Sequence, residues 1–346
     1  MKLLFLACLS PPTGNCTTAQ RIRGHVQSAG HTCVLRDIAD FQCPGDVASL
    51  FNQETPFDGV LAIHLYKCGR FLLGSQVPYG IIFGGTDINE DVKDINKRAV
   101  MEEVLEEARF AVAFSAKMKK DAKLLWVRPL GFCHCFSPAT GIETTVAPGF
   151  HWSDFLRSAG VRDAAEDLNV FLLVCGLRRV KDPLYLVEAF SEWHRKEPSV
   201  VLIIIGPKRN MWMAGLTLLS WHFHRVMGVF LAQERSREDL HAVLQHSFAL
   251  VNSSVSEGMS AAILEAMDLG VPVMVRNVPG NAAIVHHEET GLLYSSPQEF
   301  VDLSKRLLRD RCLLERLVRN GKQYTEECHS ISKERRAYQK LVELLH

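Results

Sequence analysis

Short apolar runs alternate with polar, helix-like segments along this chain, and the series occurs twice. The first series begins at residues 3–9 and continues through "TCVLRD", "DGVLAIHLYKCG", "YGIIFGG", "RFAVAFS" and "AKLLWVRP". The second comprises "NVFLLVCG", "SVVLIIIG", "GVFLA", "FALVNSS" and "VPVMV". Runs of this length that are apolar throughout are typical of parallel strands covered by helices on both faces. The pattern therefore predicts an α/β protein built from two Rossmann-like domains.

Two domains also fit the chain length, because 346 residues exceed what one hydrophobic core usually serves. A polar bridge, "HWSDFLRSAGVRDAAEDLN", separates the two series. We predict an N-terminal domain over residues 1–160, a second domain over residues 168–325 and a C-terminal helix over residues 326–346. Facing domains of this type bind ligands in the cleft between them, at the carboxyl ends of their strands.

The overall charge of the chain excludes some partners. Lys plus Arg and Asp plus Glu number 39 each, so no global field attracts nucleic acid or an anionic membrane. No apolar segment reaches the ~20 residues that cross a bilayer. Any site for an anion must therefore be local.

The start of the chain, "MKLLFLACLSPP", has two interpretations. It resembles a weak secretory signal, but it also fits a first buried strand followed by a turn and a helix that ends near Gly30. We favour the strand, which predicts a cytoplasmic protein with reduced thiols; the alternative is secretion after cleavage. The "CHC" cluster ending at Cys135 is too closely spaced for a zinc site without distant partners, so we expect no metal.

The stretch "SSVSEGMSAAILEAMDLGVPVMV", which starts at Ser253, predicts a turn after a buried strand, then a helix over residues 261–269 that Gly270 terminates. The backbone amides of Gly258, Met259 and Ser260 then lie at the helix start. Unpaired N–H groups and the helix dipole favour an anion there, and a phosphate fits best.

Two carboxylates flank this predicted anion site. Glu257 precedes the helix in the loop, and Glu265 lies on the second turn of the helix. A carboxylate accepts two hydrogen bonds and so suits the cis-diol of a ribose or a hexose. An anion with a sugar at each end is a nucleoside diphosphate sugar, for which we expect UDP or GDP as the nucleotide.

Cations for a diphosphate follow the first strand of the second series. In "CGLRRVKDP", Arg178, Arg179 and Lys181 come directly after Gly176. Arg offers a bidentate fork to phosphate oxygens and Lys a mobile charge, so the group could stabilise a departing diphosphate without a metal. The alternative is a solvated basic turn before a helix.

These motifs resemble the retaining GT-B glycosyltransferases of the "glycosyl transferases group 1" type. The E-x7-E pattern of "EGMSAAILE" is similar to the signature of that family, and "GLRRVK" is similar to its phosphate-binding segment. Further similar blocks are "GGTDINED", "AFSAKMKKDA" and "PGNAAIVHHEETGLLY". The histidine that often precedes the Gly of the first-domain block is replaced by Gly84 before Gly85, but His64 ends a neighbouring strand and is expected at the same cleft.

The resemblance implies a role for each matching residue. Glu257 is expected near the donor sugar and the reacting carbon, Glu265 at the ribose, and Arg178 with Lys181 at the diphosphate. The first domain is implied to bind the acceptor and the second the donor, with retained anomeric configuration and no metal cofactor. Two other function classes stay open, a sugar-nucleotide epimerase and a catalytically weak donor-binding protein.

Overall fold

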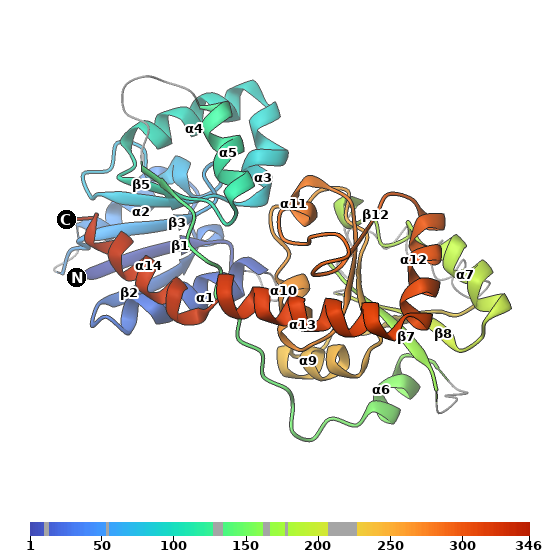
Figure 1. Ribbon diagram of the computed structural model, residues 1–346. Helices are drawn as coiled ribbons and strands as arrows, with labels where there is room; N and C mark the ends of the chain where they lie inside the picture. The colour runs from blue at the N-terminus through green and yellow to red at the C-terminus, as the bar shows by residue number, and fades with distance from the viewer. Residues whose placement is uncertain (10–13, 53–54, 127–133, 162–166, 177–178, 207–226) are drawn as a thin grey trace. The chain divides into compact units, whose positions relative to one another are not determined.

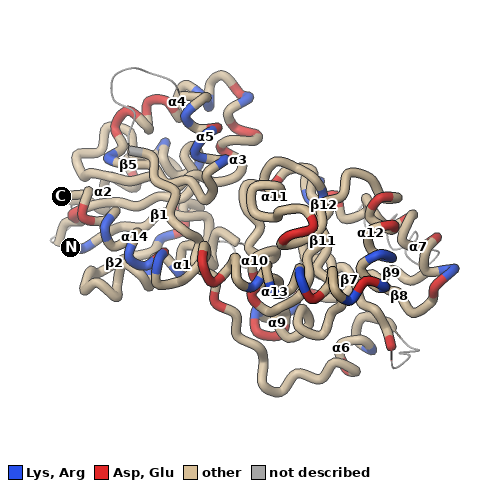
Figure 2. The backbone as a smooth tube through the Cα atoms, in the orientation of Figure 1, with Lys and Arg blue, Asp and Glu red and all other residues tan. Residues whose placement is uncertain are grey.

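The computed structural model describes residues 1–9, 14–52, 55–126, 134–161, 167–176, 179–206 and 227–346 (Figure 1). Arg178, which was predicted to bind the diphosphate, and Cys133 of the "CHC" cluster lie outside these residues. The chain forms two compact units, one of Met1–Gly141 with His329–His346, the other of Ile142–Cys328. Acidic and basic residues are interspersed along the elements of each unit (Figure 2), in line with their equal numbers.

The first unit contains a six-stranded parallel sheet with the order β2-β1-β3-β4-β5-β6. The central strands β1, β3, β4 and β5 are short and buried, as their apolar composition predicts, whereas the edge strand β2 is partly exposed. The order changes direction between β1 and β3, which makes this pair the topological switch point of the sheet. The elements are β1 (Lys2–Ala7), α1 (Gly14–Gln27), β2 (Thr32–Asp37), η1 (Ile38–Asp40), α2 (Pro44–Phe51), β3 (Gly59–Ile63), η2 (Gly69–Phe71), β4 (Tyr79–Ile82), α3 (Gly85–Asn89), η3 (Asp91–Lys93), α4 (Ile95–Glu107), β5 (Phe110–Val112), α5 (Ala116–Leu125) and β6 (His134–Phe136).

One strand of this sheet differs from the sequence prediction. The run "AKLLWVRP" was expected to be a strand, but its first four residues belong to helix α5. Ser115 caps that helix by accepting a hydrogen bond from the Met118 backbone N–H, and the helix buries Met118 and Ala122. The sixth strand is instead β6, which the sequence analysis did not predict.

The C-terminal helix α14 (Ile331–Glu343) returns to the first unit and packs on α1 (Figure 1). Its buried Glu334 accepts hydrogen bonds from Arg21 Nε at 2.8 Å and pairs with His25 Nε2 at 2.8 Å. Burial raises the pKa of Glu334, but the contacts with His25 and Arg21 outweigh burial and leave the pKa below its usual value. These ion pairs connect helix α14, at the end of the chain, to helix α1.

The second unit repeats the architecture with the strand order β12-β11-β10-β7-β8-β9, again parallel. Its switch point lies between β7 and β10. The elements are α6 (Trp152–Ser158), β7 (Asn169–Val174), η4 (Arg179–Lys181), α7 (Val187–Lys196), β8 (Val200–Ile205), β9 (Val229–Ala232), α9 (Arg237–His246), β10 (Ala249–Asn252), α10 (Ala261–Asp268), β11 (Val273–Arg276), α11 (Pro279–Ala282), β12 (Leu292–Tyr294), α12 (Pro297–Arg309) and α13 (Arg311–Cys328).

The two units confirm the predicted pair of Rossmann-like domains, while their bounds differ from the predicted residues 160, 168 and 325. Residues 142–160 belong to the second unit because α6 packs against α9. The predicted helix over residues 326–346 is the end of α13 followed by α14, and it is divided between the units. Among the described residues, no helix is both long and apolar enough to cross a membrane.

Candidate donor site

The predicted site segments follow the two strands at the switch point of the second unit. Gly176 and η4 come after β7, and the loop with Glu257 comes after the neighbouring strand β10. Crevices at a switch point, beyond the carboxyl ends of the strands, are the usual ligand sites of such sheets. The sheet order therefore brings together two segments that are about eighty residues apart in the chain.

Glu257 is held by one of its two carboxylate oxygens. Oε1 accepts hydrogen bonds from Lys181 Nζ, from Ser254 Oγ at 2.8 Å and from Asn252 Nδ2 at 3.2 Å. Only 6% of the side chain is exposed. No described residue bonds to Oε2. The carboxylate is thus fixed in place with one oxygen available to a ligand.

The loop after β10 rests on the turn that carries Lys181. Ser253 Oγ donates to the Lys181 carbonyl oxygen at 3.0 Å, and the Val255 N–H donates to the Val180 carbonyl at 3.0 Å. Asp182, with a φ of 41°, ends the turn and pairs with Arg276 at 3.0 Å. These bonds place the Lys181 ammonium and the Glu257 carboxylate side by side.

The short helix α11 supports the same loop from another direction. Asn281, fully buried, donates from Nδ2 to Asn252 Oδ1 at 3.1 Å and to the Arg276 carbonyl at 2.9 Å. Asn252 in turn donates to Glu257, so Asn281 positions that carboxylate through one intermediate. Sequence reasoning noted the "PGNAAI" block but did not assign Asn281 or Asn252 a role.

Helix α10 begins after the loop, as predicted, and ends before Gly270, whose φ of 73° requires the left-handed conformation that glycine favours. Ser260 is its N-cap residue and makes no side-chain capping bond. Within the described part of the chain, the backbone N–H groups of Gly258 and Ser260 make no hydrogen bond. These donors lie at the helix start, where anion binding stays a prediction.

Glu265 lies on α10 and has partners that the sequence analysis missed. Arg237 Nη2 lies 3.1 Å from Glu265 Oε1, and His241 Nε2 lies 3.7 Å from the same oxygen. Burial raises the pKa of Glu265, but the interactions with His241 and Arg237 outweigh burial and lower it. The carboxyl is therefore charged at neutral pH. The i, i+4 spacing of Arg237 and His241 puts both on one face of α9, the only sequence signal for the pair.

His64 and Gly85 belong to the first unit and lie near its switch point. His64 directly follows β3, has a φ of 78°, is buried, and pairs through Nε2 with Asn15 Nδ2 at 2.8 Å. Gly85 starts helix α3, three residues after the end of β4. His64 Nδ1 lies 3.2 Å from Oγ1 of Thr86, the residue after Gly85, while the position of both residues at a cleft and their role at an acceptor stay predictions.

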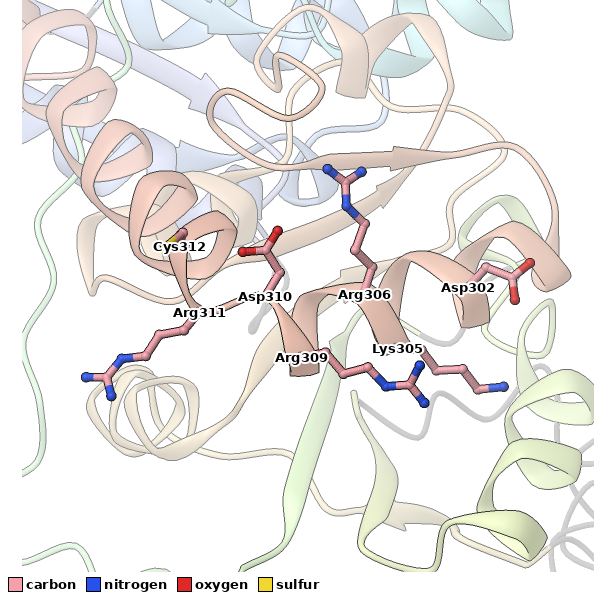
Figure 3. A pocket seen from close by; sticks show the side chains of 7 residues that line it. All are labelled: Asp302, Lys305, Arg306, Arg309, Asp310, Arg311 and Cys312. Carbon is pink, nitrogen blue, oxygen red and sulfur yellow. The ribbon is translucent and has the colours of Figure 1, made fainter.

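Neither a metal cluster nor a surface hollow identifies this site. The described residues contain no group of three or more His, Cys, Asp or Glu side chains that could hold a metal ion. A hollow at the junction of α12 and α13 contains none of the predicted site residues. The cationic ends of Lys305, Arg306 and Arg311 in that hollow point in different directions (Figure 3). They do not converge on one anion.

Solved glycosyltransferase structures share the architecture of two parallel sheets. HepE from Anabaena, solved in complex with UDP and glucose, gives a TM-score of 0.77 at 15% identity, with 99% of both chains covered. Sucrose-phosphate synthase from Thermosynechococcus elongatus gives 0.79 at 14% identity, with 100% of this chain and 99% of that protein covered. At such identities the likeness concerns the fold. The chain has the GT-B fold, the class that these glycosyltransferases define.

Comparison with the sequences of known proteins also assigns the chain to a family. The sequence model described as "Glycosyl transferases group 1" matches residues 157–324. Glycosyltransferase 1 domain-containing protein 1 of Xenopus tropicalis is 52% identical over 342 residues, covering 99% of this chain and 97% of the relative. The chain belongs to the group 1 glycosyltransferases, as its motifs indicated.

Proposed function

We propose that this protein transfers a sugar from a nucleoside diphosphate sugar to an acceptor with retention of configuration, and that UDP is the nucleotide. The observation that carries the proposal is the anchored carboxylate of Glu257, which lies beside Lys181 and three residues before Ser260, whose backbone N–H makes no hydrogen bond to a described residue. This combination offers one acceptor for sugar hydroxyls, one cation and backbone donors for phosphate oxygens. The UDP and glucose bound to the structural relative HepE support this choice of donor.

In this proposal, the diphosphate binds the amides at the start of α10 and the Lys181 ammonium. Arg178 is assigned the second cationic role from its position in the sequence. As the bond between sugar and diphosphate breaks, negative charge grows on the leaving oxygen, and fixed donors and cations stabilise it. Because Lys181 is already held by Glu257, little reorganisation is needed at that moment. We propose that no metal ion takes part.

Glu265 is assigned to the ribose of the donor. One oxygen of its carboxylate is held by Arg237, and no described residue bonds to the other. A charged carboxylate with one available oxygen is a good acceptor for hydroxyl groups. Arg237 and His241 then keep Glu265 ionised and oriented.

Thermal unfolding with UDP tests the donor site. A ligand that binds only the folded state stabilises it by about 2.7 kcal/mol at a hundredfold excess over Kd, which raises Tm by about 5 to 10 °C. Lys181→Ala should remove most of the shift, while Lys196→Ala, which changes an exposed cation on α7, should preserve it. No shift with UDP or GDP at millimolar concentration would refute the assignment. A shift that disappears with chelator would refute the metal-free part.

Turnover is tested by release of UDP from a panel of UDP sugars with mixed glycan and glycolipid acceptors. A transferase releases UDP only with an acceptor or, slowly, with water. Interconversion of the sugar without UDP release would instead indicate an epimerase, and binding without either reaction would indicate a donor-binding protein. The anomeric configuration of the product, read by proton NMR, tests retention.

We also propose that the N-terminal apolar run is retained in a reducing compartment. That run is β1, which pairs with β2 on one side and β3 on the other. Cleavage after it would remove an internal strand of the sheet. Intact mass and thiol titration of protein from cells test this point, and a shortened chain with paired cysteines would contradict it.

A further inference from the structure

Arg276 is the last residue of strand β11 in the second unit. This strand pairs with β10, and Val275 lies opposite Asn252, the last residue of β10. The Arg276 side chain therefore starts at the carboxyl edge of the sheet, where ligands of such folds bind. Sequence reasoning assigned this residue no role.

The Arg276 guanidinium joins two loops that follow other strands. Its Nη1 donates to Asp182 Oδ2 at 3.0 Å, in the turn after β7, and to the Ser253 carbonyl oxygen at 3.2 Å, in the loop after β10. Ser253 Oγ in turn donates to the Lys181 carbonyl oxygen at 3.0 Å. One cation thus connects the turn that carries Lys181 with the loop that carries Glu257.

An aromatic ring fixes the orientation of this guanidinium. Arg276 Cζ lies 3.7 Å from the centroid of the Tyr185 ring, within the range of a cation–π contact. The Tyr185 hydroxyl donates to the Ser295 carbonyl oxygen at 3.0 Å, directly after β12, so the ring is itself held in place. Only 21% of the Arg276 side chain is exposed. The planar guanidinium is thus stacked and hydrogen-bonded at once, which a lysine ammonium cannot reproduce.

The backbone of Asp182 explains why the turn needs such a partner. Its φ of 41° lies in the left-handed region, which is uncommon for residues other than glycine. Conformations of this kind persist where the surrounding structure holds them. Because Asp182 directly follows Lys181, its conformation sets the direction in which the turn presents the Lys181 side chain.

We propose that Arg276 is a positioning residue for Lys181, and that it keeps the turn after β7 in the conformation in which Lys181 meets the diphosphate of the donor. Arg276 acts through Asp182 and Ser253 and has no contact with the donor itself. The inference rests on the proposed function, because Lys181 is assigned to the diphosphate there. It separates two roles for the ion pair. A pair that only stabilises the fold affects UDP binding equally with and without Lys181, whereas a positioning residue affects UDP binding only while Lys181 is present.

Substitution of Arg276 in the parent protein and in a Lys181→Ala background tests the proposal. In the parent, Arg276→Ala should raise the Kd for UDP by about tenfold, a coupling within the range for residues of one network, and should lower kcat by about tenfold to a hundredfold. In the Lys181→Ala background, the same substitution should change the Kd by less than about twofold. Titration with UDP up to millimolar concentration measures both values.

Two further variants sharpen the comparison. Arg276→Lys should recover part of the lost affinity, because an ammonium can pair with Asp182 but lacks the fork and the stacked plane of a guanidinium. Arg306→Ala is the matched control, since it removes an arginine that pairs with Glu288 on the surface of the same unit, and it should change neither the Kd for UDP nor kcat.

Equal losses of UDP affinity from Arg276→Ala in the two backgrounds would overturn the proposal. So would a folded Arg276→Ala that binds UDP and turns over donor like the parent. If Arg276→Ala does not fold, Arg276→Lys and Asp182→Asn decide by the same comparison, because asparagine tolerates a positive φ and removes only the charge. Failure of the parent protein to bind UDP would instead refute the donor site, and this inference with it.

Discussion

Gly280 lies against the main chain of Glu257, so that a Cβ on this glycine would fall 2.0 Å from the Glu257 carbonyl oxygen. Real Cβ atoms do not approach a carbonyl this closely, so any side chain at position 280 must move the loop. The loop carries the carboxylate that Lys181 and Asn252 hold. The requirement for glycine here comes from close packing of two backbones.

We therefore expect Gly280→Ala to displace Glu257 and to lower kcat by about a hundredfold, because a shift of about 1 Å in a catalytic group has effects of this size. Steady-state kinetics with a confirmed donor measure it. The matched control is Gly24→Ala, at a helix position with nothing within 4 Å, which should preserve kcat and stabilise α1 slightly. Unchanged kcat in a folded Gly280→Ala would contradict the site.

Substitution of Glu257 and of Glu265 by alanine should change different kinetic constants. Glu265 is proposed to hold the ribose equally in the ground and transition states, so Glu265→Ala should chiefly raise KM. Glu257 is proposed to act beside the reacting carbon, so Glu257→Ala should chiefly lower kcat. A charged contact in a desolvated site is worth ~2 to 4 kcal/mol, or roughly thirty- to a thousandfold. If both variants fold and turn over donor like the parent, their functional assignment is wrong.

Asn281 should tolerate no carboxylate. In Asn281→Asp, an oxygen replaces the Nδ2 donor and faces the Asn252 Oδ1 and Arg276 carbonyl oxygens. Each oxygen keeps one backbone donor, from Ser254 and Val278, but loses the second and faces a buried carboxylate instead. We expect this to cost about 1 to 3 kcal/mol and to disturb the position of Asn252 and so of Glu257. Denaturant unfolding should show the loss of stability, and kcat should fall more than KM changes. A variant as stable and as active as the parent would exclude this positioning role.

Glu334 should make the first unit sensitive to acid. Its pKa is lowered in the folded state from the ordinary value of 4.5, so its stabilising contribution is complete above about pH 4.5 and is lost as pH falls through the folded pKa. Glu334→Gln should destabilise the unit by about 3 kcal/mol at neutral pH, because Arg21 and His25 lose a buried charge partner. It should also flatten the pH dependence below 4.5.

Hydrogen exchange of the β1 and β3 amides measures this effect within the first unit. Glu343→Gln, which changes an exposed carboxylate on the same helix, should alter the free energy of unfolding by less than about 0.5 kcal/mol. Equal effects of the two substitutions would show that the buried network contributes little.

Local patterns in the sequence determined most elements of the second unit. Buried strands such as β8 are apolar throughout. Helix α10 is built from good helix formers and lies between Gly258 and Gly270, as its sequence predicts. The motif of Glu257 and Glu265 could be placed on a loop and a helix because the two residues lie within one strand-turn-helix segment. Periodicity and turn chemistry act over a few residues, so they can be read directly.

Only the tertiary structure decided which residues meet. Arg237 reaches Glu265 and Asn281 reaches Asn252 because the folding of the second unit brings distant segments together. The same holds for α14, which contacts α1 through the buried Glu334 and adds Tyr338, Leu341 and Val342 to the core of the first unit. The order of strands and the packing of side chains depend on the whole chain, so they cannot be predicted from any short stretch of its sequence.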